Sequence, residues 1–250
     1  MTEKQYQAFC QFREQMKSAC DEWKSLADEL YPLQKESALK DTPPYPLETS
    51  VVYNRDYDNI TQESNIKLIV IGDNPGKEEQ LSSNNRYLVG QSGRIAEGFF
   101  RRNPELLTDF RINTVILNKT PVHTAKTSHL KYLSLHGSDR IKKLLIESQI
   151  RMAQLAAELH QNLETAQLWL VGYAELKGKG LFLQYRDELL RCYRNNDESM
   201  KKSWNRVFVF QHFSMNRFLI DLSKKRLPQE NLQQAICRIG TEHRKEIFLL

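Results

Sequence analysis

The stretch IKLIVIGDNPG at residues 66–76 decides the fold of this chain. Its first half is a short apolar run rich in Ile and Val, the composition of a strand buried on both faces of a sheet. Its second half stops that strand abruptly and places Asp73 and Asn74 at the carboxyl end. Ligands bind at this end of the strands in open parallel sheets. An ordinary strand-to-loop turn is the other interpretation, because Asn-Pro and Pro-Gly are common turn dipeptides.

Four apolar runs in all predict strands, and amphipathic segments between and after them predict helices. The strands are expected at residues 67–71, 113–117, 167–171 and 207–210, and the helices at residues 91–101, 139–161, 181–193, 216–225 and 229–248. Alternating strands and helices predict a parallel sheet with helices on both faces. We therefore expect an α/β fold, a three-layer α/β/α sandwich around a four-stranded parallel sheet.

The N-terminal part predicts an addition to this sandwich. Apolar residues at three- and four-residue spacing predict one amphipathic helix over residues 3–30, which ends before Pro32. Residues 1–40 are thus expected to be a helical extension of a single domain spanning residues 1–250. Three prolines make residues 41–50 a connector, and a short strand is expected at 51–53. Loops are expected at residues 77–90 and 122–135.

Composition and charge narrow the class of protein. The 250 residues carry a formal net charge of +5, which permits a polyanionic partner without requiring one. The four cysteines form no CxxC pair and none lies near a His at zinc-like spacing, which favours reduced thiols in a cytosolic protein. No signal-peptide core and no window of about 18 apolar residues is found, so we expect a cytoplasmic protein that does not span a membrane.

The polar residues at the strand ends predict one shared site. Right-handed crossovers bring the carboxyl ends of all four strands to one edge of the sheet. Asp73, Asn74, Asn118 and His212 follow three of these strands, so their side chains are expected to converge. The Walker phosphate-loop spacing and the GxSxG nucleophile elbow are both missing from the sequence, which argues against those two chemistries.

Four motifs in this order resemble the uracil-DNA glycosylase superfamily. They are GDNPG after a buried strand, YLVGQSG at residues 87–93, Asn118 after the second strand, and His-x-Ser at His212. The Asn in third place of GDNPG is similar to the GxNPG motif of the mismatch-specific and single-strand-selective branches. YLVGQSG looks more like the thermophilic family 4 and family 5 enzymes. The resemblance covers residues 67–220.

The resemblance implies a role for each matching residue. Asn74, or Asp73 beside it, would position the water that attacks C1′ of the sugar. Asn118 would read the uracil edge, and His212 would donate a hydrogen bond to uracil O2. Two more residues would border the flipped base, Gly72 and Tyr87, with the tyrosine against its face. The residues implied to contact DNA are Ser92, Ser214, Met215 and Arg217, with Met215 as an apolar wedge in the minor groove.

Each of these residues also has a purely structural interpretation. His212 could bond a nearby backbone group, Tyr87 could pack within its loop, and Asn118 could cap the loop after its strand. Met215 could belong to the core. Scattered basic residues could contact phosphates or only solvate the surface, and these are Lys126, Lys131, Arg194, Lys201, Lys202 and Arg217.

The chain departs from the family pattern at two places. Family 4 and 5 enzymes hold an iron–sulfur cluster with four cysteines, one of which follows the second-strand Asn, and this chain has Lys119-Thr120-Pro121 there. We therefore expect no cluster, no metal site and no cofactor. The late motif usually has Pro after the His, and here that residue is Phe213, which bears on substrate preference.

The resemblance predicts a monomeric DNA glycosylase of base-excision repair. It would hydrolyse the N-glycosidic bond of uracil, or of a related deaminated base, flipped out of DNA. Two alternatives stay open at this point. One is a superfamily member without catalysis that binds nucleic acid, and the other is a hydrolase of small nucleosides.

Overall fold

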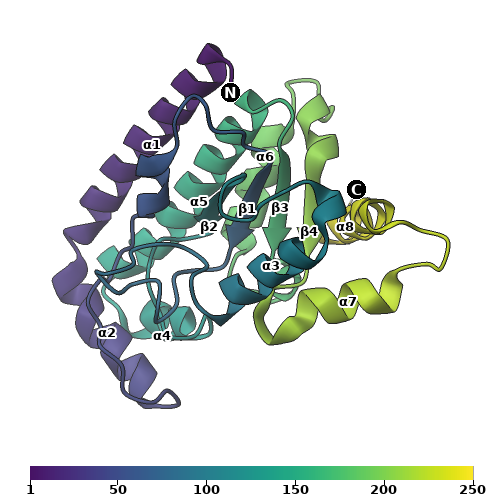
Figure 1. The fold of residues 1–250 in the computed structure, drawn as a ribbon. Coiled ribbons are helices and arrows are strands. Elements are labelled where there is room, and N and C mark those ends of the chain that lie inside the picture. Colours follow the sequence, from purple (N-terminus) through teal and green to yellow (C-terminus); the bar gives the residue numbers. More distant parts are fainter. Residues whose placement is uncertain (250) are drawn as a thin grey trace.

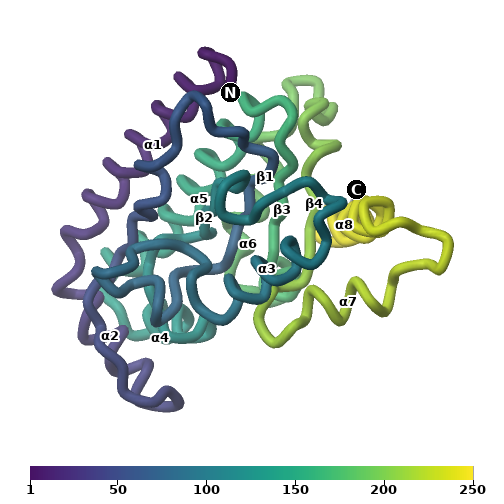
Figure 2. Tube along the Cα trace, in the orientation of Figure 1, coloured from purple at the N-terminus to yellow at the C-terminus, as the bar shows by residue number. Residues whose placement is uncertain are grey.

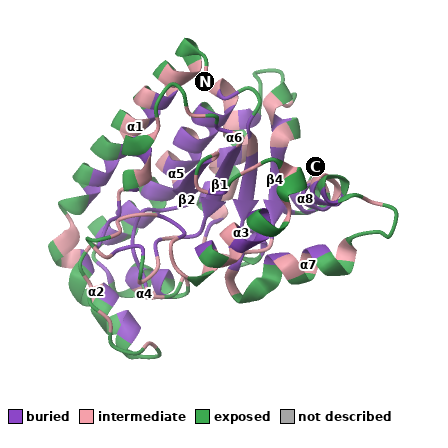
Figure 3. Cartoon of the chain, in the orientation of Figure 1, coloured by how far each residue is buried: buried purple, intermediate pink, exposed green. Residues whose placement is uncertain are grey.

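The computed structural model describes residues 1–249 and contains a four-stranded sheet in which all strands run parallel. The strands are β1 (Leu68–Gly72), β2 (Thr114–Asn118), β3 (Gln167–Val171) and β4 (Val207–Phe210), in the spatial order β2-β1-β3-β4. Every strand residue except Gln167 is buried, as the apolar runs predict (Figure 3). The α/β class and the four predicted strands are confirmed, with strand boundaries within one residue.

Helices cover both faces of the sheet and complete three layers (Figure 1). One face lies under α1 (Glu3–Lys24), α5 (Asp139–Asn162) and α6 (Leu183–Tyr193), and the other under α3 (Gln91–Arg102), α7 (Arg217–Lys225) and the first part of α8 (Leu232–Phe248). Successive side chains of a strand point to opposite faces. Ile69 and Ile71 accordingly join the first core, whereas Leu68 and Val70 join the second.

The N-terminal residues form two helices, so the prediction of a single helix over residues 3–30 is wrong. α1 ends at Lys24, and α2 (Ala27–Leu39) contains Pro32 as its sixth residue. Pro32 lies past the first four residues, whose N–H groups have no partner within a helix, so it removes the hydrogen bond that this position would donate to the carbonyl of Asp28. α1 packs on α5, and α2 packs on α4 (His129–His136), a helix within the predicted loop at 122–135.

The topology places a crevice between β1 and β3. The connection from β1 to β2 passes through α3 on one face, and the connection from β3 to β4 passes through α6 on the other. The two neighbouring strands therefore send their chains to opposite sides, which is the switch point where ligands bind in open α/β sheets. The carboxyl ends of these strands, at Gly72 and Val171, border this crevice.

The segment between α2 and β1, residues 40–67, first contacts the loops at the carboxyl ends of the strands and then runs back to the N-terminus. The short strand expected at residues 51–53 is reduced to one antiparallel bridge between Val51 and Val122. The chain continues beside α1 (dark blue in Figure 2), and the amino group of Met1 donates to the carbonyl of Gln62. None of the helices formed by residues 1–249 is both long and apolar enough to cross a membrane.

Candidate functional site

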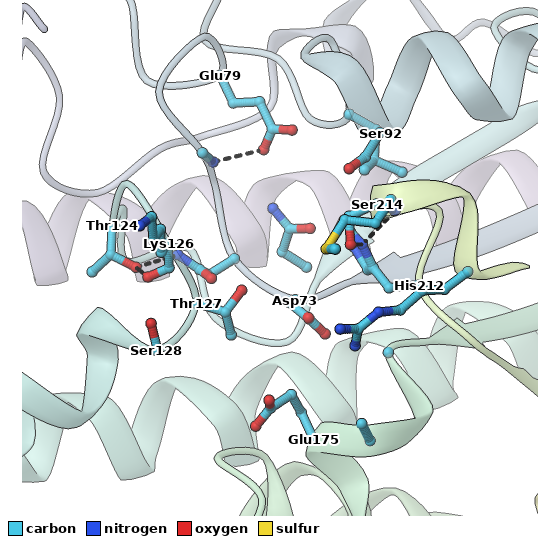
Figure 4. A pocket seen from close by; sticks show the side chains of 18 of the residues that line it. Asp73, Glu79, Ser92, Thr124, Lys126, Thr127, Ser128, Glu175, His212 and Ser214 are labelled. Carbon is cyan, nitrogen blue, oxygen red and sulfur yellow. Dashed lines mark hydrogen bonds between the residues drawn. The ribbon is translucent and has the colours of Figure 1, made fainter. Parts of the chain in front are cut away.

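A cavity of about 470 Å³ opens at the carboxyl ends of the strands. Eight of the ten site residues expected from the sequence line it, and these are Asp73, Asn74, Ser92, Asn118, His212, Ser214, Met215 and Arg217. In the view of Figure 4, Asp73 lies between Thr127 and His212, with Glu79 above it and Glu175 below. The predicted convergence of polar strand-end residues is therefore confirmed.

Asp73 is paired with a lysine that is wholly inside the protein. Nζ of Lys119 lies 2.6 Å from Oδ1 of Asp73, 2.6 Å from the carbonyl of Val171 and 3.2 Å from the carbonyl of Gly72. Three acceptors match the three N–H groups of an ammonium, whereas a neutral amine has only two. Burial lowers the pKa of Lys119, and the charge of Asp73 opposes that effect. We take the pair to be ionised.

Gly172 makes room for this ion pair at the end of β3. Its φ of +95° is rarely adopted by residues with a side chain. A Cβ at this position would lie 2.3 Å from Oδ1 of Asp73 and 3.1 Å from Nζ of Lys119. Only glycine therefore allows the strand end, the carboxylate and the ammonium to meet.

The Asn74 amide is oriented by its nitrogen and leaves its oxygen free. Nδ2 donates to Oγ1 of Thr124 at 2.8 Å and makes longer contacts with the carbonyls of Pro75 and Val122. All three neighbours are acceptors, which assigns the nitrogen to this side. Oδ1 is buried and has no hydrogen-bond partner within residues 1–249. The cavity wall thus offers one unused acceptor.

Asn118 offers an unused donor on the next strand. The residue is buried and lines the cavity, yet its Nδ2 has no partner among the described residues. Nδ2 therefore does not cap the loop after β2, as the structural interpretation of Asn118 would require. Gly72 does not line the cavity as expected. It supports Asn118 instead, because a Cβ there would lie 2.4 Å from Oδ1 of that residue.

His212 presents Nε2 as its hydrogen-bond donor. The backbone N–H of Ser214 donates to Nδ1 at 3.1 Å, and the Ser214 hydroxyl lies 2.8 Å from the same atom. Since Nδ1 is an acceptor, the ring hydrogen of the neutral form lies on Nε2. Burial lowers the pKa of His212, Lys119 and Arg217 act in the same direction, and Asp73 opposes them. The ring is thus neutral at pH 7.

Tyr87 is a core residue, and the role expected for it beside a flipped base is corrected. The side chain is fully buried, its hydroxyl donates to the carbonyl of Val52 at 2.6 Å, and it does not line the cavity. Other residues of YLVGQSG also serve the packing of this loop. A Cβ on Gly93 would fall 1.4 Å from the carbonyl oxygen of Leu88, which Arg111 also contacts. This motif places Leu88 and Ser92 at the cavity.

The late motif keeps its backbone shape despite the departure at Phe213. The φ of Phe213 is −65°, the value that a proline ring would impose, and its side chain is buried against Phe218 and Phe110. Met215 is 72% exposed, so the interpretation as a core residue is wrong. Met215 and Asn216 both have left-handed φ values, 55° and 56°, which are costly for residues other than glycine.

The sequence analysis missed several residues that line the cavity. Glu79 is buried and one of its oxygens accepts from the N–H of Gly76 at 3.1 Å. Burial raises its pKa to about 7. The missed residues in the loop before α4 are Thr124, Ala125, Thr127 and Ser128. Their sequence carries no motif, and only the fold brings them to the strand ends.

The cavity is lined by both charged and neutral polar side chains, among them Asp73, Asn118 and Arg217. No cluster of three or more His, Cys, Asp or Glu side chains that could hold a metal occurs within the described part of the chain. No protein-family model matches the chain, and no curated protein sequence is significantly similar to it.

Proposed function

We propose that the protein is a DNA glycosylase that hydrolyses the N-glycosidic bond of uracil or a related deaminated base. The observation that supports this most strongly is the pair of unused, buried polar atoms on one cavity, Oδ1 of Asn74 and Nδ2 of Asn118. Buried polar groups are normally hydrogen-bonded, so such atoms are expected to meet a ligand or water.

Asn74 suits the task of holding the attacking water. A water that donates one hydrogen to Oδ1 turns a lone pair toward the sugar C1′. The amide cannot rotate freely, because its nitrogen is held by Thr124. Asp73 is the less suitable candidate, because its Oδ1 already accepts from Lys119. We assign the water to Asn74 and a charge-stabilising role to Asp73, whose carboxylate favours the cationic character of the sugar in the transition state.

Asn118 and His212 suit the base. An amide offers one donor and one acceptor, which matches the N3–H and O4 groups of uracil and mismatches the amino edge of cytosine. The departing base becomes anionic at O2. A neutral His212 with its hydrogen on Nε2 stabilises that charge as it forms, and the loss of one such donor typically costs about 10²–10³ in rate.

The residues at the mouth of the cavity suit the binding of a nucleotide whose base has been flipped out of the stack. An enzyme acting on a nucleobase must flip it out of a duplex or take it from a single strand. The exposed Met215 and Arg217 lie at the cavity beside Ser92 and Ser214. These side chains offer one apolar contact, one charge and two hydroxyl groups to the nucleotides on either side of the flipped one.

The test is alkali-revealed cleavage of a single-stranded oligonucleotide that contains one uracil, under single-turnover conditions. The variants are Asn74→Ala and His212→Ala, with Asn195→Ala and His136→Ala as matched controls on the exposed surface. We expect cleavage by the wild type and by both controls, and a loss of about 10²-fold or more in each site variant.

Other results would identify the alternatives. Salt-dependent binding of the oligonucleotide without base release, unchanged in Asn74→Ala, would indicate a binding protein that lacks catalysis. Release of uracil from free deoxyuridine, with no dependence on oligonucleotide length, would indicate a nucleoside hydrolase. No release from uracil, hypoxanthine or xanthine substrates would refute the proposed function.

A further inference from the structure

The loop that carries Asn74 is fixed through the carbonyl group of Pro75, the next residue. Besides the longer contact from Asn74 itself, this carbonyl accepts two hydrogen bonds from the loop after β2, from the backbone N–H of Thr124 at 3.2 Å and from Nδ1 of His123 at 2.9 Å. Thr124 is also the residue whose hydroxyl accepts from Nδ2 of Asn74. The position of the amide therefore depends on how His123 and Thr124 are held.

The ring of His123 has its hydrogen fixed by its two neighbours. Nδ1 faces a carbonyl oxygen, which only accepts, so Nδ1 carries the hydrogen and Nε2 is an acceptor. The Tyr45 hydroxyl lies 2.9 Å from Nε2 and donates to it. The ring is fully buried, and burial lowers the pKa of His123 to about 4, so it is neutral around pH 7.

The backbone of His123 is held by the N-terminal part of the chain as well. Its N–H donates to the carbonyl of Ser50 at 2.9 Å, and its carbonyl accepts from Nε2 of Gln34 at 2.8 Å. Gln34 lies on α2 and is itself buried. Side-chain and backbone contacts from residues 34–50 thus converge on one histidine.

Gln80 ties the same segment to the loop after Asn74. Its Oε1 accepts from the backbone N–H groups of Glu48, at 2.6 Å, and Thr49, at 3.0 Å. Its Nε2 donates to the carbonyl of Pro46 at 2.7 Å. Residues 45–50 consequently join the loop at 74–80 to the loop at 122–128, and both of these loops contribute residues to the cavity wall.

We propose that Tyr45 and His123 are positioning residues of this site. The Tyr45 hydroxyl fixes the ring hydrogen of His123, His123 fixes the Pro75 carbonyl, and the carbonyl fixes the loop that presents Asn74. The inference rests on the proposed function, because the step that it serves is the placing of the attacking water. It makes residues 34–50, which lie outside the resemblance, part of the framework that positions the site.

The test compares Tyr45→Phe with the matched control Tyr53→Phe. Phenylalanine at 45 keeps the ring that packs edge-on against His123, with centroids 5.7 Å apart, and removes only the hydroxyl. Tyr53 is also half-buried, but its hydroxyl donates to Asp58, away from the cavity. We expect single-turnover uracil release, measured well below the melting temperature, to fall about 10-fold in Tyr45→Phe and to stay at the wild-type value in the control. The melting temperature of Tyr45→Phe should fall modestly, because Nε2 of the buried His123 loses its donor.

A second measurement does not depend on activity. In ¹⁵N-labelled protein, the side-chain NH₂ signal of Asn74 is expected to shift in Tyr45→Phe and not in Tyr53→Phe, and Nδ1 of His123 is expected to be protonated. Equal rates for the two variants, or an Asn74 signal that does not respond to Tyr45→Phe, would overturn the inference. If the wild type releases no base, the proposed function fails, and the NMR signals alone decide whether Tyr45 and His123 hold the Asn74 loop.

Discussion

The ammonium group of Lys119 lies 2.6 Å from a carboxylate oxygen of Asp73, with the lysine fully buried and the aspartate side chain 10% exposed. The two residues come from the ends of adjacent strands, β2 and β1. An unpaired charge at this buried position would lower the stability of the fold, so each of the two residues requires the other.

We predict that Lys119→Met destabilises the fold strongly. Removing one partner of a buried ion pair leaves an uncompensated charge and typically costs about 3–5 kcal/mol. The double variant Lys119→Met, Asp73→Asn should regain part of that loss, because both charges are gone. Urea unfolding at pH 7 measures all three proteins.

The control for this experiment is an ion pair on the surface. Lys142 and Asp139 are 3.1 Å apart with both side chains exposed, so Lys142→Met should change the free energy of unfolding by less than about 1 kcal/mol. A cost of that small size for Lys119→Met would mean that the Asp73–Lys119 pair contributes no more than a surface contact.

Two glycines with positive φ should differ sharply when changed to alanine. Gly178 has a φ of +61° and nothing within 4 Å of an added Cβ, so Gly178→Ala should cost about 1 kcal/mol of backbone strain. Gly172→Ala adds a clash with Asp73 and Lys119 to its strain. We expect its melting temperature to fall well below that of Gly178→Ala, and similar melting temperatures would contradict the packing described at the end of β3.

The buried carboxyl of Glu79 should make the protein less stable as the pH rises. Its pKa is about 7 in the fold against 4.5 for the free side chain. The contribution of Glu79 is therefore present below about pH 4.5 and is lost as the pH rises through 7, up to about 3 kcal/mol. Glu79→Gln removes this loss, because a glutamine oxygen still accepts from Gly76. Its melting temperature at pH 8 should exceed that of the wild type.

The exposed neighbour of Glu79 is the matched control. Glu78→Gln should follow the wild-type curve of melting temperature against pH, since Glu78 lies on the surface. If both glutamine variants follow that curve, the Glu79 carboxyl is not held in the way described.

Two buried histidines should make the protein less stable as the pH falls, which is the opposite of the effect of Glu79. Burial lowers the pKa of His123 to about 4 and that of His160 to about 3, against 6.5 for the free side chain. The unfolded chain binds more protons in this range, so stability is lost as the pH falls from 6.5 toward 4. Near pH 5 the two residues together contribute a slope of about 2.5 kcal/mol per pH unit.

Urea unfolding between pH 4 and 7 measures this slope. A variant of one histidine separates the contributions of the two residues. His160→Gln should remove about half of the contribution, whereas the exposed His136→Gln should leave the slope unchanged. An unchanged slope in His160→Gln would show that this ring titrates normally in the fold.

The sheet and most of the site could be predicted because they depend on local patterns. Four short apolar runs bounded by polar residues predict buried strands, and parallel strands bring their ends to one edge. Asn74, Asn118 and His212 were found in this way. The single N-terminal helix is predicted wrongly because the break at Ser25 and Leu26 carries no glycine or proline, whereas Pro32, which looks like a stop signal, lies inside α2.

The misassigned and missed residues depend on tertiary contacts that no local pattern contains. A tyrosine next to a polar loop looks the same whether its ring faces a ligand or, like Tyr87, enters the core. Lys119 looks like a surface lysine until Gly172 and Asp73 are placed around it. Glu79 reaches the cavity, and Tyr45 reaches His123, only because two loops and the segment after α2 fold over one another.

The ion pair at the end of β1 also couples positions 73, 119 and 172, so that the residue at one of them limits which residues the other two can hold. A lysine at position 119 has no room for its ammonium until position 172 is glycine, and it has no counter-charge until position 73 is aspartate. A substitution at either neighbour therefore leaves the buried ammonium crowded or without a counter-charge, so the three positions behave as one unit.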